Sequence, residues 1–245
     1  MPAVKGSIGG NTINISLGDM TAVAADAYIV PEFNSAASFG GVGGAIARAG
    51  ASAGLNDYQE YIDKNGEQPY GQVILTPSYG GQSQHLLHVV SVGSGGDKEF
   101  STVQTSIFNA LKVAEANGIK KIVIPALGTG IIGRLSDEQS AKAMMSAIHD
   151  YAQSGGTPIE VSFVLFARQP TQDTFARVLS TRSYENVASE AGSREISLVR
   201  WQEGMSSDAE ADRRFAAQED AAMRSTHAIK PMKPIVMKKK KQPGG

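Results

Sequence analysis

The chain has 245 residues, of which 41% are hydrophobic and 19% charged, and this composition is typical of a globular protein with a sizeable core. It contains no cysteine, which excludes disulfides, thiolate nucleophiles and cysteine-ligated metals and agrees with a reducing, cytoplasmic compartment. Its first residues lack the apolar stretch of a secretory signal, and no apolar run reaches the roughly 20 residues of a membrane-spanning helix.

Short apolar runs alternate with helical patterns along the first three quarters of the chain. Because the runs are short and rich in β-branched residues, they are typical of buried strands. The six predicted strands are Ile13 to Leu17, Ala27 to Val30, Val73 to Thr76, Leu86 to Ser91, Ile122 to Pro125 and Val161 to Phe166.

Four helices are predicted between and after these strands. One starts after Gly44, one is capped by Ser101, and one follows Pro170. The remaining helix begins at Ser136, with Gln139 three residues later as a capping box. Strands that alternate with long helices predict an α/β fold of three layers, α/β/α, around a largely parallel sheet. An antiparallel pairing of the early strands would make this sheet mixed.

The alternation ends near Arg182, which divides the chain into a lead (1–10), one domain (11–182) and an extension (183–245). The extension is polar except for Ile196 to Trp201 and ends in a Pro-, Lys- and Gly-rich stretch, so we expect it to be mostly disordered. Its six lysines from Lys230 onward predict weak, salt-sensitive attraction to nucleic acid or anionic lipid, with a purely solvating tail as the alternative.

A first glycine-rich loop follows the strand that ends at Pro31. It carries Asn34 and four glycines within residues 40–44, and it leads directly into a helix. Glycines let a ligand approach the backbone closely, and a helix N-terminus offers unpaired N–H groups, so the loop suits a phosphate. A flexible connection is the alternative interpretation.

A second glycine-rich loop, within residues 120–134, again follows a strand and precedes a helix. Ligands of α/β sheets bind at the carboxyl ends of strands, so two such loops could clasp a diphosphate. The chain has no G-x-x-x-x-G-K-[ST] motif, and the first loop fails G-x-G-x-x-G because position 46 is Ile.

Four motifs in order resemble the macrodomain family. They read Gly18-Asp19-Met20-Thr21, then Asn34, then Gly40 to Ile46, and finally Pro125 to Gly133. The resemblance covers about residues 11–182. It implies a macrodomain fold that binds ADP-ribose, free or attached to a protein or nucleic acid, as ligand or substrate, with no cofactor and no metal.

The resemblance also implies residue roles. Asp19, beside Met20, would accept a hydrogen bond from the adenine amino group, and Phe166 would stack on the adenine. Asn34 would contact the distal ribose and serve as the catalytic residue of a hydrolase. The alternatives are a turn aspartate, a core phenylalanine and a loop-capping asparagine. The two phosphate loops would contribute Gly41, Val42, Gly43 and Gly44, and Leu127, Gly128, Thr129, Gly130, Ile131 and Ile132.

The sequence departs from the family pattern where the distal ribose would lie. The family's N-A-A-N reads Pro31-Glu32-Phe33-Asn34 here, so Pro31 stands in place of its first asparagine. Phe39 replaces a glycine, and Ile132 replaces an aromatic residue. Gly43 stands where one hydrolytic branch has aspartate, and an aspartate introduced there would raise the rate provided that it does not block the loop. Two functions stay open: hydrolysis of mono-ADP-ribosyl esters or O-acetyl-ADP-ribose, and non-catalytic reading of ADP-ribose.

Other polar residues are interpreted as structural. His85 and His88 are three apart on a predicted strand, so they point to opposite faces and are poor metal ligands. The acids Asp57, Glu60 and Asp63 are typical of a solvated helix face.

Overall fold

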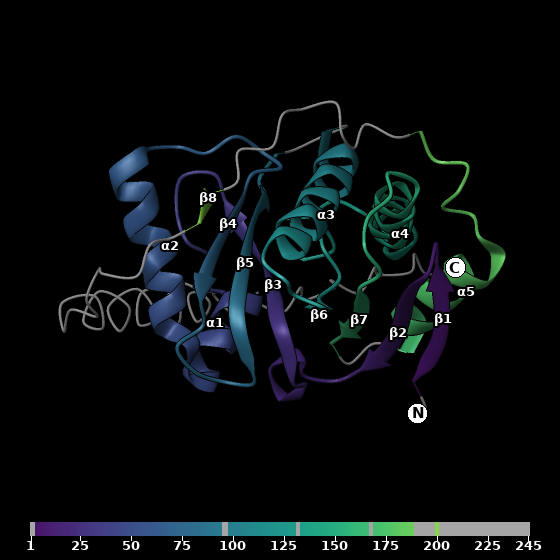
Figure 1. The fold of residues 1–245 in the computed structure, drawn as a ribbon, viewed down its shortest axis with the longest axis horizontal. Helices are drawn as coiled ribbons and strands as arrows, with labels where there is room; N and C mark the ends of the chain where they lie inside the picture. Colours follow the sequence, from purple (N-terminus) through teal and green to yellow (C-terminus); the bar gives the residue numbers. More distant parts are fainter. Residues whose placement is uncertain (1–2, 95–97, 131–132, 167–168, 189–198, 201–245) are drawn as a thin grey trace, which may run out of the picture.

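The protein folds around one eight-stranded sheet (Figure 1), seen in a computed structural model that describes residues 3–94, 98–130, 133–166, 169–188 and 199–200. The strand order is β1-β2-β7-β6-β3-β5-β4-β8. The strands are β1 (Val4–Ile8), β2 (Asn11–Leu17), β3 (Ala25–Phe33), β4 (Val73–Pro77), β5 (Ser83–Val92), β6 (Lys121–Ile124), β7 (Glu160–Leu165) and β8 (Val199–Arg200).

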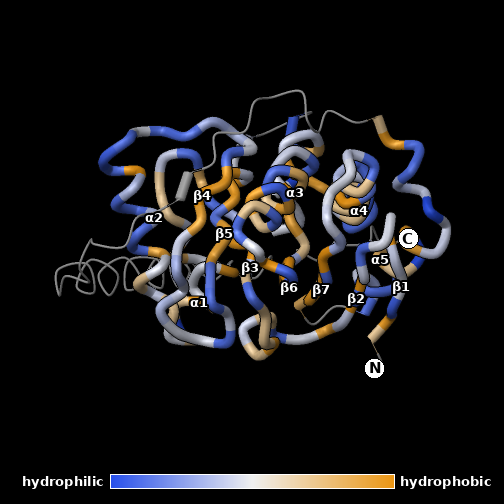
Figure 2. Tube along the Cα trace, viewed as in Figure 1, coloured by the Kyte–Doolittle hydropathy of each residue, from blue (hydrophilic) through white to orange (hydrophobic). Residues whose placement is uncertain are grey.

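Helices cover both faces of the sheet, which confirms the predicted three layers. One face packs on α3 (Lys98–Ala116), α4 (Asp137–Gln153) and α5 (Gln169–Thr181), through a large cluster that includes Ile29 and Phe163. The other face packs on α1 (Gly41–Ile46), a π-helical turn (Ala47–Ala51) and α2 (Ser52–Asn65), through smaller clusters. Hydrophobic colour concentrates on the central strands in Figure 2, whereas α2 is mostly hydrophilic.

All six predicted strands are present, and the sheet is mixed. Its antiparallel pairs are β1–β2 and β4–β5, whereas β2 and β3, the two early predicted strands, are separated by β7 and β6. The antiparallel pairing expected between those two is therefore wrong. The sequence could not reveal this, because the residue pattern of a strand shows which of its faces are buried but not which strands lie beside it.

One predicted helix start is confirmed, whereas α1, α3 and α5 each begin a few residues before their predicted starts. Ser136 caps α4 with the predicted capping box, its hydroxyl accepting from the Gln139 N–H at 3.2 Å. In contrast, α3 already includes Lys98, so Ser101 lies within its first turn and is not its cap; the Ser101 hydroxyl donates to the Lys98 carbonyl at 3.1 Å.

The fold extends beyond the predicted domain limits at both ends. Residues 4–8, within the predicted lead, form β1 along β2, and two residues of the extension form β8 along β4. Tyr184 is buried in the main core and its ring lies 5.9 Å from that of His149. The lysine-rich end lies outside the described residues. Among the helices described, none has the length and apolar character that crossing a bilayer requires.

We expect Tyr184→Ala to destabilise the domain by about 3 kcal/mol, because truncating a buried aromatic side chain leaves a cavity. Chemical denaturation monitored by circular dichroism measures this change in the free energy of unfolding. The control is Asn186→Ala, since Asn186 is exposed two residues along the same segment. Equal stability of both variants would show that the fold does not depend on residues beyond 182.

Candidate functional site

Four adjacent strands bring the predicted site residues to one edge of the sheet. The strands β2, β7, β6 and β3 are consecutive neighbours and all parallel, so their carboxyl ends meet at the same edge. Asp19 follows β2, Phe166 follows β7, the second glycine loop follows β6, and Asn34 with the first glycine loop follows β3. These four segments therefore line up in that order along the edge.

Asp19 is an exposed acid that also shapes its own turn. Its Oδ1 accepts hydrogen bonds from the Thr21 N–H at 2.9 Å and the Thr21 hydroxyl at 2.8 Å, capping a short 3₁₀ helix (Met20–Ala22). These bonds, from the backbone first, hold the pKa of the carboxyl below its usual value, so it is ionised at neutral pH. Met20 packs in the core beside Tyr28, so what it offers a ligand is its backbone.

Phe166 is 82% exposed immediately after β7. The Gly18 N–H donates to the Leu165 carbonyl at 3.0 Å. Asp19 directly follows Gly18 and Phe166 directly follows Leu165, so this hydrogen bond holds the backbones of the two site residues close together. The prediction that Phe166 is available for stacking, and not a core residue, is consistent with this exposure. An exposed aromatic ring and a carboxylate at the ends of neighbouring strands are suited to a planar base that carries an amino group.

The first glycine loop is shaped by close packing of its own backbone. A Cβ on Gly43 would lie 1.6 Å from the Ser38 carbonyl oxygen, and a Cβ on Gly44 would lie 2.7 Å from that of Phe39. Gly41 has a φ of +52°, which favours glycine. An aspartate at position 43 was expected to raise the rate of hydrolysis provided that it does not block the loop. That condition is not met, because any side chain at this position collides with the backbone of Ser38.

The first turn of α1 offers fewer amides than expected. The Gly44 N–H already donates to the Gly40 carbonyl at 3.3 Å. The amides of Gly41, Val42 and Gly43 belong to the first turn, where a helix supplies no partners for them. These three are the candidates to bind a phosphate, and Gly44 contributes close packing instead.

Asn34 is half-buried just after β3, next to an acid that the sequence analysis did not single out. The side-chain Nδ2 of Asn34 donates to Glu67 Oε2 at 3.3 Å, and the backbone carbonyl of Asn34 accepts from the Gln68 N–H at 2.8 Å. Glu67 lies in the loop after α2, and no local sequence signal links it to Asn34 because 33 residues separate them. The pair leaves the amide oxygen of Asn34 as its acceptor toward a ligand.

The second glycine loop is a compact turn braced by a buried acid. Gly128 has a φ of +75°, its carbonyl accepts from the Leu135 N–H at 3.0 Å, and the Thr129 hydroxyl donates to the Ala126 carbonyl at 3.1 Å. From α3, the buried Glu99 accepts the Arg134 N–H at 3.0 Å.

Not every residue assigned to this second loop can contact a ligand with its side chain. Leu127 is a core residue, whereas Gly130 is exposed with open space around its Cα. Ile131 and Ile132 lie outside the described residues.

The remaining polar predictions have mixed outcomes. His88 is fully buried and His85 is half-buried, which agrees with structural roles. Within the described ranges, no group of three His, Cys, Asp or Glu side chains is arranged to hold a metal ion. Asp57 was expected on a solvated face, but it is buried, and Tyr79 donates to its Oδ2 at 2.8 Å. Burial raises the Asp57 pKa to about 6.

We expect Gly43→Ala to destabilise the protein by about 3 kcal/mol or to displace the loop, because a backbone carbonyl cannot move aside as a flexible side chain can. The matched control is Gly40→Ala. Gly40 has a φ of −97° and nothing within 4 Å of its Cβ position, so the change should cost no more than about 1 kcal/mol. Denaturation curves of both variants measure the difference, and equal curves would contradict the packing described.

Comparison with known proteins agrees with this architecture. The Macro domain family model matches residues 33–144. An uncharacterized protein of Pyrobaculum aerophilum is 31% identical over 170 residues, covering 68% of this chain and 90% of that protein. An O-acetyl-ADP-ribose deacetylase of Escherichia fergusonii is 27% identical over 175 residues, covering 71% and 98%. A mutant of the Oceanobacillus iheyensis macrodomain with ADPR superposes with a TM-score of 0.66 at 23% identity, covering 74% and 99%. With its sheet order, its two glycine loops and these similarities, the chain belongs to the macrodomain family.

Proposed function

We propose that the protein binds ADP-ribose at the carboxyl edge of β2, β7, β6 and β3 and hydrolyses an ester of it. The observation that carries this proposal is the order of groups along the edge. An ionised carboxylate and a bare aromatic ring stand at one end, and the first-turn amides of α1 with Asn34 stand at the other. The second glycine loop lies between them.

This order matches the order of parts in ADP-ribose. The adenine would stack on Phe166 and donate its amino hydrogen to Asp19, while the diphosphate would pass between the two glycine loops. The distal ribose would then reach Asn34. The relatives named O-acetyl-ADP-ribose deacetylase and the macrodomain structure with ADPR support the same ligand class.

Ester hydrolysis at the distal ribose needs an oriented water and a group that takes its proton. Asn34, held by Glu67, is suited to orient the ribose hydroxyl or the water, since a neutral amide positions but does not act as a base. The diphosphate of the substrate, held by the amides of Gly41 to Gly43, could accept the proton. Water adds to the ester carbonyl carbon, and the bond from that carbon to the ribose oxygen breaks. The proton passes from the diphosphate to the departing ribose oxygen, so the products are a carboxylic acid and the free hydroxyl of ADP-ribose.

Reading of ADP-ribose without catalysis is the second candidate, and Gly43 favours it because the acid of one hydrolytic branch is absent there. Attraction of the lysine-rich end to nucleic acid and a cytoplasmic location both stay predictions. The binding assays below apply to either function, and the release assay separates the two.

For binding, we expect Asp19→Asn to lower ADP-ribose affinity by roughly ten- to a hundredfold, since it removes a charged hydrogen-bond acceptor. Asparagine keeps the cap on the Thr21 N–H, so the melting temperature should hardly change. Isothermal titration calorimetry measures the affinity, with Asp173→Asn on the exposed side of α5 as the control. Unchanged affinity in Asp19→Asn would contradict the assignment of Asp19 as the acceptor of the adenine amino group.

For catalysis, we expect Asn34→Ala to lower turnover by roughly ten- to a thousandfold and to leave ADP-ribose affinity nearly intact. An interaction used mainly in the transition state alters the rate more than the binding. Release of acetate from O-acetyl-ADP-ribose, and of ADP-ribose from a glutamate-modified protein, measures turnover. If the unaltered protein binds ADP-ribose but releases nothing above buffer, it is a reader.

A further inference from the structure

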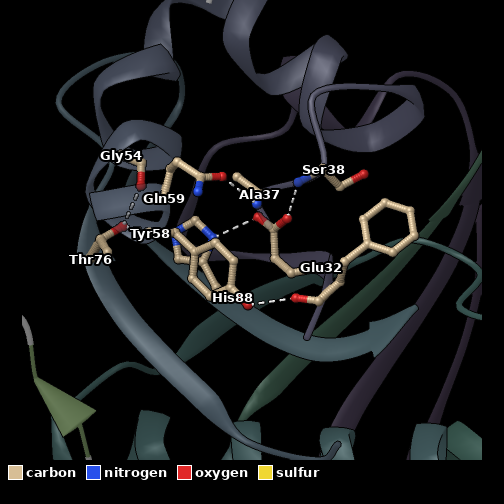
Figure 3. A network of polar contacts seen from close by, with 9 residues as sticks. Glu32, Ala37, Ser38, Gly54, Tyr58, Gln59, Thr76 and His88 are labelled. Carbon is tan, nitrogen blue, oxygen red and sulfur yellow. Dashed lines mark hydrogen bonds and ion pairs between the residues drawn. The ribbon is translucent and has the colours of Figure 1, made fainter. Parts of the chain in front are cut away.

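Glu32 and His88 form a buried polar pair that the proposed chemistry does not use. Both side chains are fully buried between the sheet and α2, and Glu32 Oε1 lies 2.8 Å from His88 Nδ1 (Figure 3). The ring of Tyr58 stacks on the His88 ring at 4.8 Å. Burying two ionisable groups costs free energy of folding unless their hydrogen bonds are all satisfied. Such a costly pair therefore indicates a specific role for the two side chains.

The hydrogens of the pair are assigned from its hydrogen-bond partners, since the roles of the two His88 ring nitrogens depend on the tautomer. The Thr76 hydroxyl donates to the Gly54 carbonyl at 3.3 Å, so its oxygen is free to accept from His88 Nε2, which lies 2.9 Å away. Nε2 then bears a hydrogen. One more hydrogen lies between Nδ1 and Oε1, either on the imidazole of an ion pair or on the carboxyl of a neutral pair.

Burial favours the neutral pair. It raises the pKa of the Glu32 carboxyl well above its usual value and lowers the pKa of His88 to about 3. Both directions place the shared hydrogen on Glu32, which donates it to Nδ1.

The other carboxyl oxygen of Glu32 holds the first glycine loop. Oε2 accepts the Ser38 N–H, while Gln59 accepts the Ala37 N–H at 2.9 Å and the Tyr58 hydroxyl donates to the Phe33 carbonyl at 2.8 Å (Figure 3). The carbonyl of the same Ser38 is the atom against which Gly43 packs. Glu32 therefore acts on the loop through Ser38. By binding the Ser38 N–H it holds the segment that starts at Asn34, and the Ser38 carbonyl in turn packs against the first turn of α1.

We propose that Glu32, uncharged and bonded to His88, is the positioning residue that sets the first glycine loop for the distal ribose and diphosphate. The proposal rests on the proposed function for its ligand. It assigns a role to a position where the family pattern has an alanine instead, and it predicts that the loop needs a hydrogen-bond acceptor at Glu32 but no charge.

The deciding comparison is Glu32→Gln against Glu32→Met. A glutamine amide can donate to His88 Nδ1 while its oxygen accepts the Ser38 N–H, so Glu32→Gln should keep ADP-ribose affinity within about twofold. Methionine has a similar volume but no strong acceptor, so Glu32→Met should lower affinity by about tenfold or more. The control is Glu138→Met, since Glu138 lies partly exposed on α4, on the opposite face of the sheet. If Glu32→Gln loses as much as Glu32→Met, the uncharged pair is wrong.

Hydrogen exchange of the Ser38 amide, followed by NMR in ligand-free protein, tests the loop contact independently of binding. The amide should be protected in the unaltered protein and in Glu32→Gln, and exchange at least about tenfold faster in Glu32→Met. Fast exchange in the unaltered protein overturns the positioning role. If Glu32→Met does not fold, Glu32→Gln still decides between the two charge states. If the unaltered protein does not bind ADP-ribose, the proposed function is wrong. The exchange rate of the Ser38 amide still tests the contact between Glu32 and the loop in that case.

Discussion

The parallel pairing of β2, β7, β6 and β3 is the constraint on which the candidate site depends. Each strand contributes one segment beyond its carboxyl end, and the pairing alone brings segments as distant as Asp19 and Phe166 next to each other. Of these neighbours, β6 and β7 are consecutive in the chain, and the connection between them runs through α4, because parallel neighbours cannot be joined by a tight turn. The short strand β6 also matters, since its pairing with β3 ends at Tyr28. Beyond that point Pro31 can occupy a central strand without removing a ladder bond on that side.

Glycine-rich loops bend easily but have few side chains to fix their conformation. In this protein two buried carboxyl groups hold them by accepting hydrogen bonds from their backbones. Glu32 accepts the Ser38 N–H in the first loop, and Glu99 accepts the Arg134 N–H in the second. Each acid lies on a rigid element, β3 for the first loop and α3 for the second. A site that must meet a phosphate with backbone amides gains from such anchoring, because preformed donors need no rearrangement when the ligand arrives.

The glycines of the two loops serve different physical needs. Gly41 and Gly128 have left-handed backbone, whereas Gly43 must be glycine because the Ser38 carbonyl occupies the space of a side chain. Gly40, Gly41 and Gly130 have open space around them and are positions that a ligand could approach. The sequence shows all of these as the same letter, so only their surroundings separate the glycines that pack from those that are free.

The sequence by itself determined six of the eight strands, the helix faces, the capping box at Ser136 and the four motifs that place this chain among macrodomains, because these depend on local periodicity and on short spacings. It also carried a signal that was not used: Glu32 shares the inward phase of Tyr28 and Val30, which marks it as buried. Only the tertiary structure decided which residues complete the site. Glu32 meets His88 across 56 residues, Asn34 meets Glu67 across 33, and Asp57 is covered by Tyr79. Such contacts depend on how strands are ordered and helices laid over them, and no local pattern encodes that order.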